Sequence, residues 1–155
     1  MLSQTVEYAL RAAVFLASEA PTPRTAQQIA EATSVPPGYL AKVLQQLVKA
    51  GLTSSRRGLH GGFLLARPAP QIPVLDVVNA VDPIRRIRRC PLGLAAHAGD
   101  LCALHRTLDD AFATIERSFA DATLDDLAGS RPGAGAPCAW PAQPHEASRR
   151  KAFRR

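Results

Sequence analysis

The sequence predicts a mainly α-helical fold with one small β-hairpin, and three observations support this. Residues 1–50 contain three helix-length segments whose apolar residues recur at helical spacing. A glycine-rich segment with two short apolar runs follows directly at 52–66. A longer amphipathic segment occupies 106–127. The first two observations together are typical of a winged helix-turn-helix, and the third adds a long C-terminal helix.

The first two helices have recognisable starting residues. Ser3 can cap a helix over 4–18, whose apolar residues form one stripe and which two prolines follow. Thr25 can cap a second helix at 26–33, with Gln28 at the Glu-or-Gln position of a capping box. Each helix therefore presents one apolar face to a common core.

A third helix is predicted at 39–50, after a short proline- and glycine-containing turn. Its expected buried residues are Leu40, Val43, Leu44, Leu47 and Val48. Two short helices joined in this way match a helix-turn-helix, and the alternative is an αα-hairpin with a solvated polar face. The segment that follows favours the first interpretation, because it predicts strands at 52–56 and 62–66 around a tip of arginines and glycines.

The distribution of charge indicates where phosphates would bind. The chain of 155 residues has a net charge of +6 and a pI near 9.9, but residues 131–155 hold six basic residues against one acidic residue. The stronger signal is the segment 32–75, which contains five Lys or Arg and no Asp or Glu. A helix and a basic hairpin without acidic residues suit a surface that contacts phosphates. We therefore expect double-stranded DNA as a partner.

The residues expected to contact DNA lie on the third helix, at the hairpin tip and at the starts of the first two helices. They are Ser3, Thr25, Pro37, Gly38, Tyr39, Lys42, Gln45, Arg56, Arg57, His60, Gly61 and Gly62. Gln45 is of a type that pairs with adenine, whereas Arg56 and Arg57 can neutralise phosphates or enter the minor groove. The other interpretation of the tip is an ordinary charged hairpin.

Beyond the hairpin we expect four further parts. An amphipathic helix near 74–81 packs back on the first three and completes a DNA-binding domain over 1–82. Residues 83–105 form a loop of sensor type that contains four arginines, two cysteines and two histidines. A dimerisation helix follows at 106–128, and a disordered basic tail at 129–155. The long helix has an apolar stripe that a homodimer would cover, and folding back on its own domain is the alternative.

Four runs of sequence carry a family pattern. They are LSQTVEYALRAAVFLA at 2–17, YLAKVLQQLVKAGL at 39–52, SSRRGLHGGFLLAR at 54–67 and DVVNAV at 76–81. In these runs, and over about residues 1–128, the chain resembles the bacterial Rrf-two family of transcriptional regulators. The resemblance implies a homodimeric winged-helix transcription factor, most often a repressor. It also implies that the third helix and the hairpin lie on DNA and that the long helix crosses the same helix of its partner.

The loop offers thiol and imidazole ligands for a metal. In cluster-binding members of the family three cysteines lie six residues apart, and a histidine often follows the last by three. Cys90, Cys102 and His105 match the first, third and histidine positions, whereas the middle position is Ala96, beside His97. Three interpretations stay open. An iron–sulfur cluster can be held with His97 or a partner-chain residue as substitute ligand, Cys90 and Cys102 can form a disulfide on oxidation, or the loop is inert.

The sequence argues against several other classes of protein. Three cysteines are too few and too widely spaced for a secreted disulfide scaffold, and neither a signal peptide nor a membrane-length apolar run is present, so we expect a cytoplasmic protein with no membrane partner. No nucleophile motif, phosphate loop or HExxH pair indicates an enzyme. The main alternative is a winged-helix protein without a cluster, or a protein–protein adaptor controlled by a partner or small molecule.

Overall fold

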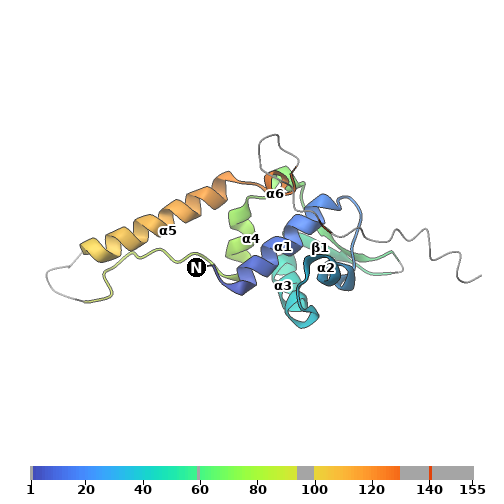
Figure 1. Cartoon of the computed structure of the whole chain (residues 1–155), viewed down its shortest axis with the longest axis horizontal. Helices are drawn as coiled ribbons and strands as arrows, with labels where there is room; N and C mark the ends of the chain where they lie inside the picture. The colour runs from blue at the N-terminus through green and yellow to red at the C-terminus, as the bar shows by residue number, and fades with distance from the viewer. Residues whose placement is uncertain (1, 59, 94–99, 130–139, 141–155) are drawn as a thin grey trace, which may run out of the picture.

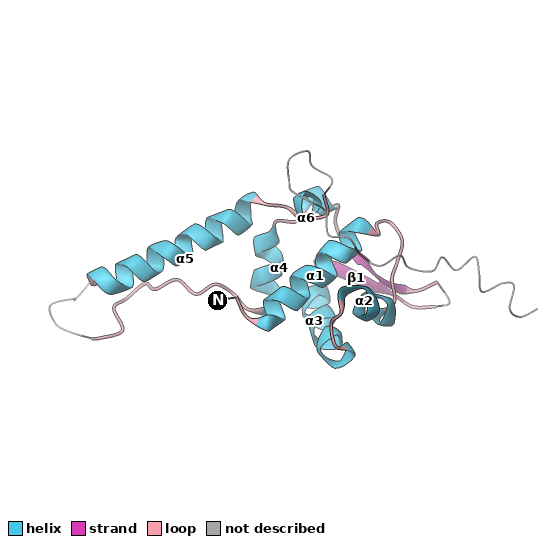
Figure 2. Ribbon diagram, in the orientation of Figure 1, coloured by secondary structure: helices cyan, strands magenta, loops and turns pink. Residues whose placement is uncertain are grey.

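The structure is a computed structural model that describes residues 2–58, 60–93, 100–129 and 140. Its elements are α1 (Gln4–Ser18), α2 (Ala26–Thr33), α3 (Pro37–Lys49), β1 (Thr53–Arg56), β2 (Gly62–Leu65), the 3-10 helix η1 (Ala69–Gln71), α4 (Val74–Val81), α5 (Ala103–Asp121) and α6 (Leu124–Leu127). Figures 1 and 2 show α1–α4, α6 and the hairpin as one body, from which α5 extends to one side. The part of the chain that the structure describes contains no candidate membrane-spanning helix. The predicted mainly α fold with a small β-wing is confirmed.

Helix α1 lies at the centre of the body. Its start is capped by Ser3, whose side-chain oxygen accepts a hydrogen bond from the N–H of Val6 at 3.4 Å, as predicted. Three alanines of α1 are fully or almost fully buried, and small side chains let neighbouring helices approach closely. On the side of α2 and α3, Phe15 packs with Ile29 and Leu40 in one apolar cluster. The buried apolar residues of the body form three clusters, and α1 contributes to each of them.

The capping box predicted at the start of α2 is present. The N–H of Gln28 donates to the Thr25 hydroxyl at 3.2 Å, and the Gln28 side chain accepts from the Thr25 N–H at 2.9 Å. The helix ends at Ser34, which has a positive φ of 54°. Helix α2 thus begins at a local signal that the sequence alone shows.

One of the five buried positions predicted on α3 is wrong. The four positions that are buried as predicted are Leu40, Val43, Leu44 and Leu47. Val48, in contrast, is 37% exposed, because the helix turns about 100° between Leu47 and Val48 and only the first points into the core. The exposed side of α3 is therefore broader than the sequence pattern suggests.

The hairpin is a two-stranded antiparallel sheet. Thr53 pairs with Leu65 and Arg56 with Gly62, so the strands match the predicted ones to within one residue. Arg24, before α2, adds an isolated bridge: its N–H donates to the Phe63 carbonyl at 2.9 Å, and its own carbonyl accepts from the Phe63 N–H at 2.7 Å. This bridge joins the hairpin to the α1–α2 connection.

The predicted single helix over 106–127 is two helices in the structure. Helix α5 ends at Asp121, and α6 starts from Thr123, whose hydroxyl accepts from the Asp126 N–H at 3.3 Å. The break lets the chain turn back onto the body, where Leu124 is fully buried and its N–H donates to the Ile72 carbonyl at 3.0 Å. A local cap and a buried leucine therefore end the long helix early.

The predicted disordered tail at 129–155 lies, apart from Gly129 and Trp140, outside the described residues, and so does Cys138. Trp140 is half-buried, and its ring meets that of Phe15 edge to face, with centroids 5.8 Å apart and planes at 82°. One residue of the predicted tail therefore contacts the core of the body, which the sequence did not indicate.

Candidate DNA-binding surface and metal site

The outer side of α3 is polar and exposed. Tyr39 is 57% exposed, and its ring packs edge to face on Tyr8 of α1, with centroids 6.1 Å apart. Lys42 and Gln45 follow on the same side, since the apolar positions between them point into the core. An open groove of about 640 Å³ runs beside them, lined by Thr5, Tyr39, Lys42, Val43, Gln45, Gln46, Lys49 and Val81. Pro37 and Gly38 are also exposed, in the first turn of α3.

The tip of the hairpin is a tight turn that exposes two arginines. The Gly61 N–H donates to the Gly58 carbonyl at 2.9 Å, and Gly58 has a φ of +110°. A Cβ at Gly61 would meet backbone atoms of Arg56 and Arg57, so only glycine fits there. Arg56, Arg57 and His60 are all exposed. The tip therefore presents cationic side chains on a backbone that leaves no room for a larger residue at its turn.

Gly62, at the turn end of β2, lies against the α1–α2 connection. Its φ of +152° is one that side chains rarely adopt, and a Cβ there would lie 2.6 Å from the Arg24 carbonyl oxygen. Arg24 itself is 8% exposed, and its guanidinium pairs with Glu19 at the end of α1. Sequence reasoning missed Arg24, because nothing in the sequence around it marks a bridge to a strand almost forty residues away.

Ser3 and Thr25, the two remaining predicted contacts, act as helix caps through their hydroxyls. The Ser3 side chain is half-buried, whereas Thr25 is exposed. The predicted DNA-binding residues thus lie on three features of one body: the start of α1, the α2–α3 pair and the hairpin tip (Figure 1).

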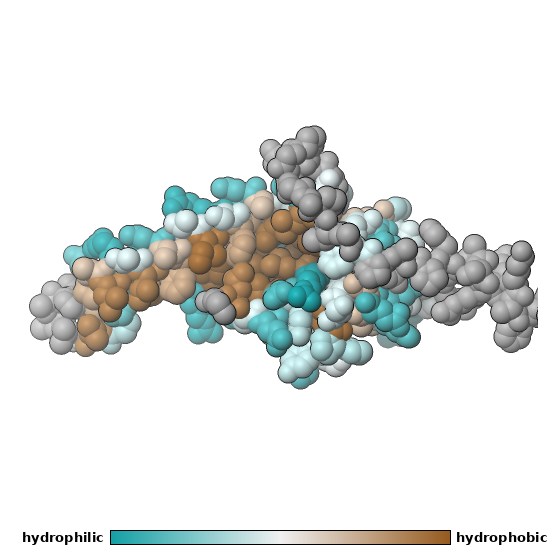
Figure 3. Space-filling view, viewed as in Figure 1, coloured by the Kyte–Doolittle hydropathy of each residue, from teal (hydrophilic) through white to brown (hydrophobic). Residues whose placement is uncertain are grey.

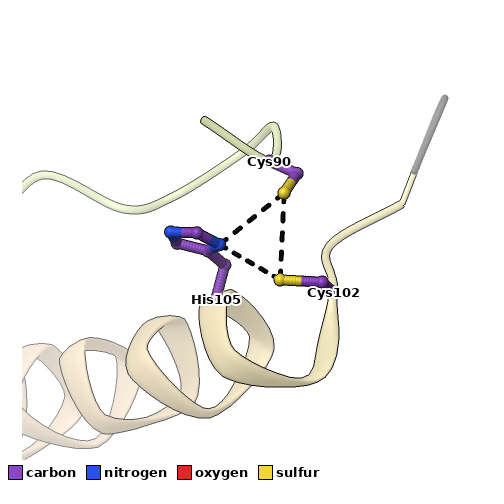
Figure 4. Close-up of side chains that lie close together, drawn as sticks. All are labelled: Cys90, Cys102 and His105. Atoms are coloured by element: carbon purple, nitrogen blue, oxygen red, sulfur yellow. Dashed lines mark hydrogen bonds between the residues drawn. The ribbon is translucent and has the colours of Figure 1, made fainter. Parts of the chain in front are cut away.

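Three predicted ligands come together at the far end of α5. The Sγ atoms of Cys90 and Cys102 are 3.8 Å apart, and Nδ1 of His105 lies 3.6 Å from the first and 3.2 Å from the second (Figure 4). The two cysteines are not joined in a disulfide, and all three residues are half-buried. Among the described residues, this is the group of Cys and His ligands that can hold a metal ion.

The local fold explains two of the three positions. Cys102 is the residue that precedes the first turn of α5, and His105 lies within that turn, so the two side chains project from one helix end. The prediction that the loop continues to residue 105 is wrong, because α5 already begins at Ala103. Ala96 and His97 lie outside the described residues.

An ion-pair cluster joins the segment before Cys90 to α5. Asp109 accepts hydrogen bonds from Arg86 Nε at 2.7 Å, from Arg86 Nη2 at 2.6 Å and from the Ile87 N–H at 2.8 Å. Arg86 Nη1 also donates to Glu116 at 3.2 Å. The bond from Arg86 is the main cause that lowers the pKa of Asp109 to about 2, and partial desolvation opposes it. Sequence reasoning missed this pairing and placed Arg86 only among the four arginines of the loop.

Sequence comparison assigns the chain to a family. Residues 2–130 match the Rrf2 family, described as an iron-dependent transcriptional regulator. The Mycobacterium tuberculosis protein Rv1287, which bears the name of an HTH-type transcriptional regulator, is 35% identical over 130 residues, or 83% of this chain and 81% of that protein. Protein aau3 of Rhizobium meliloti is 30% identical over 138 residues, or 84% of this chain and 86% of that protein.

Solved structures show the same fold. IscR of T. potens matches with a TM-score of 0.71 and 24% identity, covering 90% of this chain and 93% of that one. CymR, the global cysteine regulator of B. subtilis, matches with a TM-score of 0.70 and 22% identity, covering 84% of this chain and 98% of that one. The family match over nearly the whole chain, together with this winged-helix fold, shows that the chain belongs to the Rrf2 (Rrf-two) family of DNA-binding transcriptional regulators and is not an enzyme.

Proposed function

We propose that the protein binds double-stranded DNA in a sequence-specific manner as a homodimer, in the cytoplasm, and represses transcription from the sites it binds. One observation carries the proposal: the segment without acidic residues, 32–75, folds into the exposed side of α3 and the arginine-bearing hairpin tip. Duplex DNA carries one negative charge per about 1.7 Å of helix axis, so a surface without carboxylates avoids repulsion over its whole length.

The two features suit different parts of the duplex. An α-helix of this size fits the major groove, where Gln45 can pair with adenine and Lys42 can reach a phosphate. Arg56 and Arg57 at the hairpin tip are suited to phosphates or to the minor groove. A docking surface for a protein partner has little reason to exclude Asp and Glu over the whole segment, and this argues against the adaptor alternative.

The homodimer is proposed from α5. No residue of α5 is buried, and its stripe of four large apolar side chains is exposed: Leu104 by 61%, Leu108 by 42%, Phe112 by 37% and Ile115 by 40%. Figure 3 shows this hydrophobic surface continuing along α5 toward the body. A second copy of the same helix would cover it, and a two-fold dimer would present two α3 helices to the two halves of a palindromic site.

For the ligand group we propose one tetrahedral metal ion with an open fourth position. Thiolates at about 2.3 Å and an imidazole at about 2.0 Å from such an ion lie about 3.8 Å and about 3.5 Å from one another. The measured separations of 3.8, 3.6 and 3.2 Å agree with this arrangement. An iron–sulfur cluster usually takes four protein ligands spread over its irons, whereas the three described donors surround one point and are one ligand short, which favours the single ion.

The DNA-binding proposal is tested by removing the tip charges. Arg56→Ala/Arg57→Ala should weaken binding to every DNA sequence and flatten the slope of log affinity against log salt by about 0.9 for each phosphate that the variant no longer neutralises. Gln45→Ala should instead reduce affinity only for a cognate duplex, by about 1–3 kcal/mol. Fluorescence anisotropy over a salt series, with a cognate duplex selected from a random library and a scrambled duplex, separates the two effects.

The matched control is Arg106→Ala/Arg117→Ala on α5, which removes the same charge away from the proposed surface. It should leave the salt slope within error of that of the unsubstituted protein. A tip variant that binds both duplexes with the original affinity and slope would exclude the hairpin from the DNA interface.

A further inference from the structure

The metal-ligand group is assembled from two separate segments. Cys102 and His105 lie within one turn of each other at the start of α5, so the helix alone sets their separation. Cys90 comes from residues 83–90, which form neither a helix nor a strand. The distance between Cys90 and the other two ligands therefore depends on what attaches that segment to α5.

The Asp109 carboxylate of α5 binds the segment 83–90. It accepts two bonds from the guanidinium fork of Arg86 and one from the Ile87 N–H, so it holds both a side chain and the backbone of the segment. Its side chain is 14% exposed, and its pKa of about 2 means that it is ionised at neutral pH. Charge-assisted bonds of this kind, in a bidentate pair, have fixed geometry as well as strength.

The spacing of these residues brings the ligands together. Asp109 follows His105 by four residues, which is about one helical turn or about 6 Å along α5. Ile87 precedes Cys90 by three residues, a span of at most about 10 Å of extended chain. A bond between Ile87 and Asp109 thus confines Cys90 to the neighbourhood of His105, where its Sγ is found 3.6 Å from Nδ1.

We propose that Asp109, through Arg86 and Ile87, is the positioning residue that brings the Cys90 thiol to Cys102 and His105. Asp109 does not itself bind the metal. This inference rests on the proposed metal site for one of its measurements, whereas the proximity of the two thiols can be measured without any metal. The simpler alternative is that the ion pair only stabilises α5, in which case its removal would change stability and leave the thiol site intact.

The test compares Asp109→Asn with Asp110→Asn in the full-length protein. Asp110 is the exposed neighbour on the same helix, so both variants lose one carboxylate and keep its shape. Cys138→Ser in every protein leaves two thiols. Cobalt(II) serves as the probe metal, because its thiolate charge-transfer absorbance reports the number of bound thiolates. We expect Asp109→Asn to lower cobalt affinity by about tenfold and the absorbance per bound cobalt toward that of one thiolate, and Asp110→Asn to change neither.

The second measurement uses metal-free protein and oxidised glutathione. The two thiols of Cys90 and Cys102 give up two electrons and two protons as their disulfide forms, and the oxidant is reduced to two glutathione thiols. One protein thiolate first attacks glutathione disulfide and releases one glutathione thiol, and the other protein thiol then attacks the mixed disulfide and releases the second. Asp109→Asn should slow this second, intramolecular attack by about tenfold, because the thiols meet less often, and Asp110→Asn should not slow it. Arg86→Lys, which keeps the charge but loses the guanidinium fork, should slow it less, and it replaces Asp109→Asn if that variant does not fold.

The outcomes separate this inference from the proposed function. If unsubstituted protein binds no cobalt but Asp109→Asn still slows disulfide formation, the metal proposal fails and the positioning role stands. If Asp109→Asn matches Asp110→Asn in both measurements while its helix content and melting temperature fall, the ion pair is only structural and the inference is overturned.

Discussion

The body and the α5 arm are stabilised by different means. In the body, α1, α2, α3 and α4 each bury apolar residues in clusters that share α1. In the arm, α5 buries none of its residues and exposes four large apolar side chains. Its attachments include the Arg86 ion pairs, the bond from the Ile87 N–H to Asp109, and the contact of Phe119 with the small apolar cluster of Val6, Val74 and Val78.

This difference indicates a division of labour. A region with its own core keeps one shape, which suits a surface that must match a DNA groove. The position of a helix without a core of its own is set by ion pairs and by the partner that packs on its apolar stripe. This suits an element that responds to a partner or to a metal. Changes that act on the arm should therefore alter assembly and sensing, whereas changes in the body should alter folding.

The largest effect is expected from charging the stripe of α5. Leu108→Glu/Ile115→Glu places two carboxylates where a second α5 would pack, and burial of unpaired charge is strongly unfavourable. The dimer dissociation constant should rise by at least about a hundredfold, as for central interface positions. Sedimentation velocity across a concentration series measures this dissociation constant. The variant should also lose cooperative binding to the two half-sites of a DNA site.

Thr107→Glu/Thr114→Glu is the control for this prediction. It adds the same charge at the same seven-residue spacing on α5, at exposed positions off the stripe. This variant should stay dimeric. If both variants dimerise like the original chain, the stripe is not the dimer interface, and another surface packs on α5.

A smaller effect, confined to the body, is expected from Gly62→Ala. The new Cβ would lie 2.6 Å from the Arg24 carbonyl oxygen at a φ of +152°, so the bridge between hairpin and body must shift. We expect the free energy of unfolding to fall by about 3 kcal/mol. In Gly38→Ala, the new Cβ at the start of α3 meets nothing within 4 Å. This substitution should raise the free energy of unfolding by up to about 1 kcal/mol. Urea denaturation measures both, and equal effects would contradict the packing described at Gly62.

Much of the body could be predicted because its signals are local. Ser3 and the Thr25–Gln28 box mark helix starts within four residues, and the α3 apolar positions follow one helical period. The same kind of signal was present and missed at Thr123, where Thr-x-x-Asp starts α6 and breaks the predicted long helix. Because the helical spacing of apolar residues continues past the Thr123 cap, the sequence pattern wrongly predicted one helix.

The tertiary attachments could not be predicted in this way. The bridge from Arg24 to Phe63, the bond from Arg86 to Asp109 and the contact of Trp140 with Phe15 each join residues more than twenty positions apart. A single arginine or aspartate looks like a solvated surface residue until its partner is known. For the ligand group, the sequence supplied Cys90, Cys102 and His105 through a family resemblance, whereas the residue that brings them together came only from the structure.

The smallest effect is expected from the pH dependence of the Arg86–Asp109 ion pair. The folded-state pKa of Asp109, about 2, lies below its ordinary value of 3.8, so its ionised form favours the folded arm. That contribution is fully present above about pH 4 and is lost as the pH falls toward 2. The melting temperature of unsubstituted protein should therefore exceed that of Asp109→Asn at pH 5, and most of the difference should be lost by pH 2. A series of circular-dichroism melts at four pH values, with Asp110→Asn as reference, measures it. A difference between the two proteins that is constant over this range would mean that the Arg86–Asp109 pair does not hold the arm in solution.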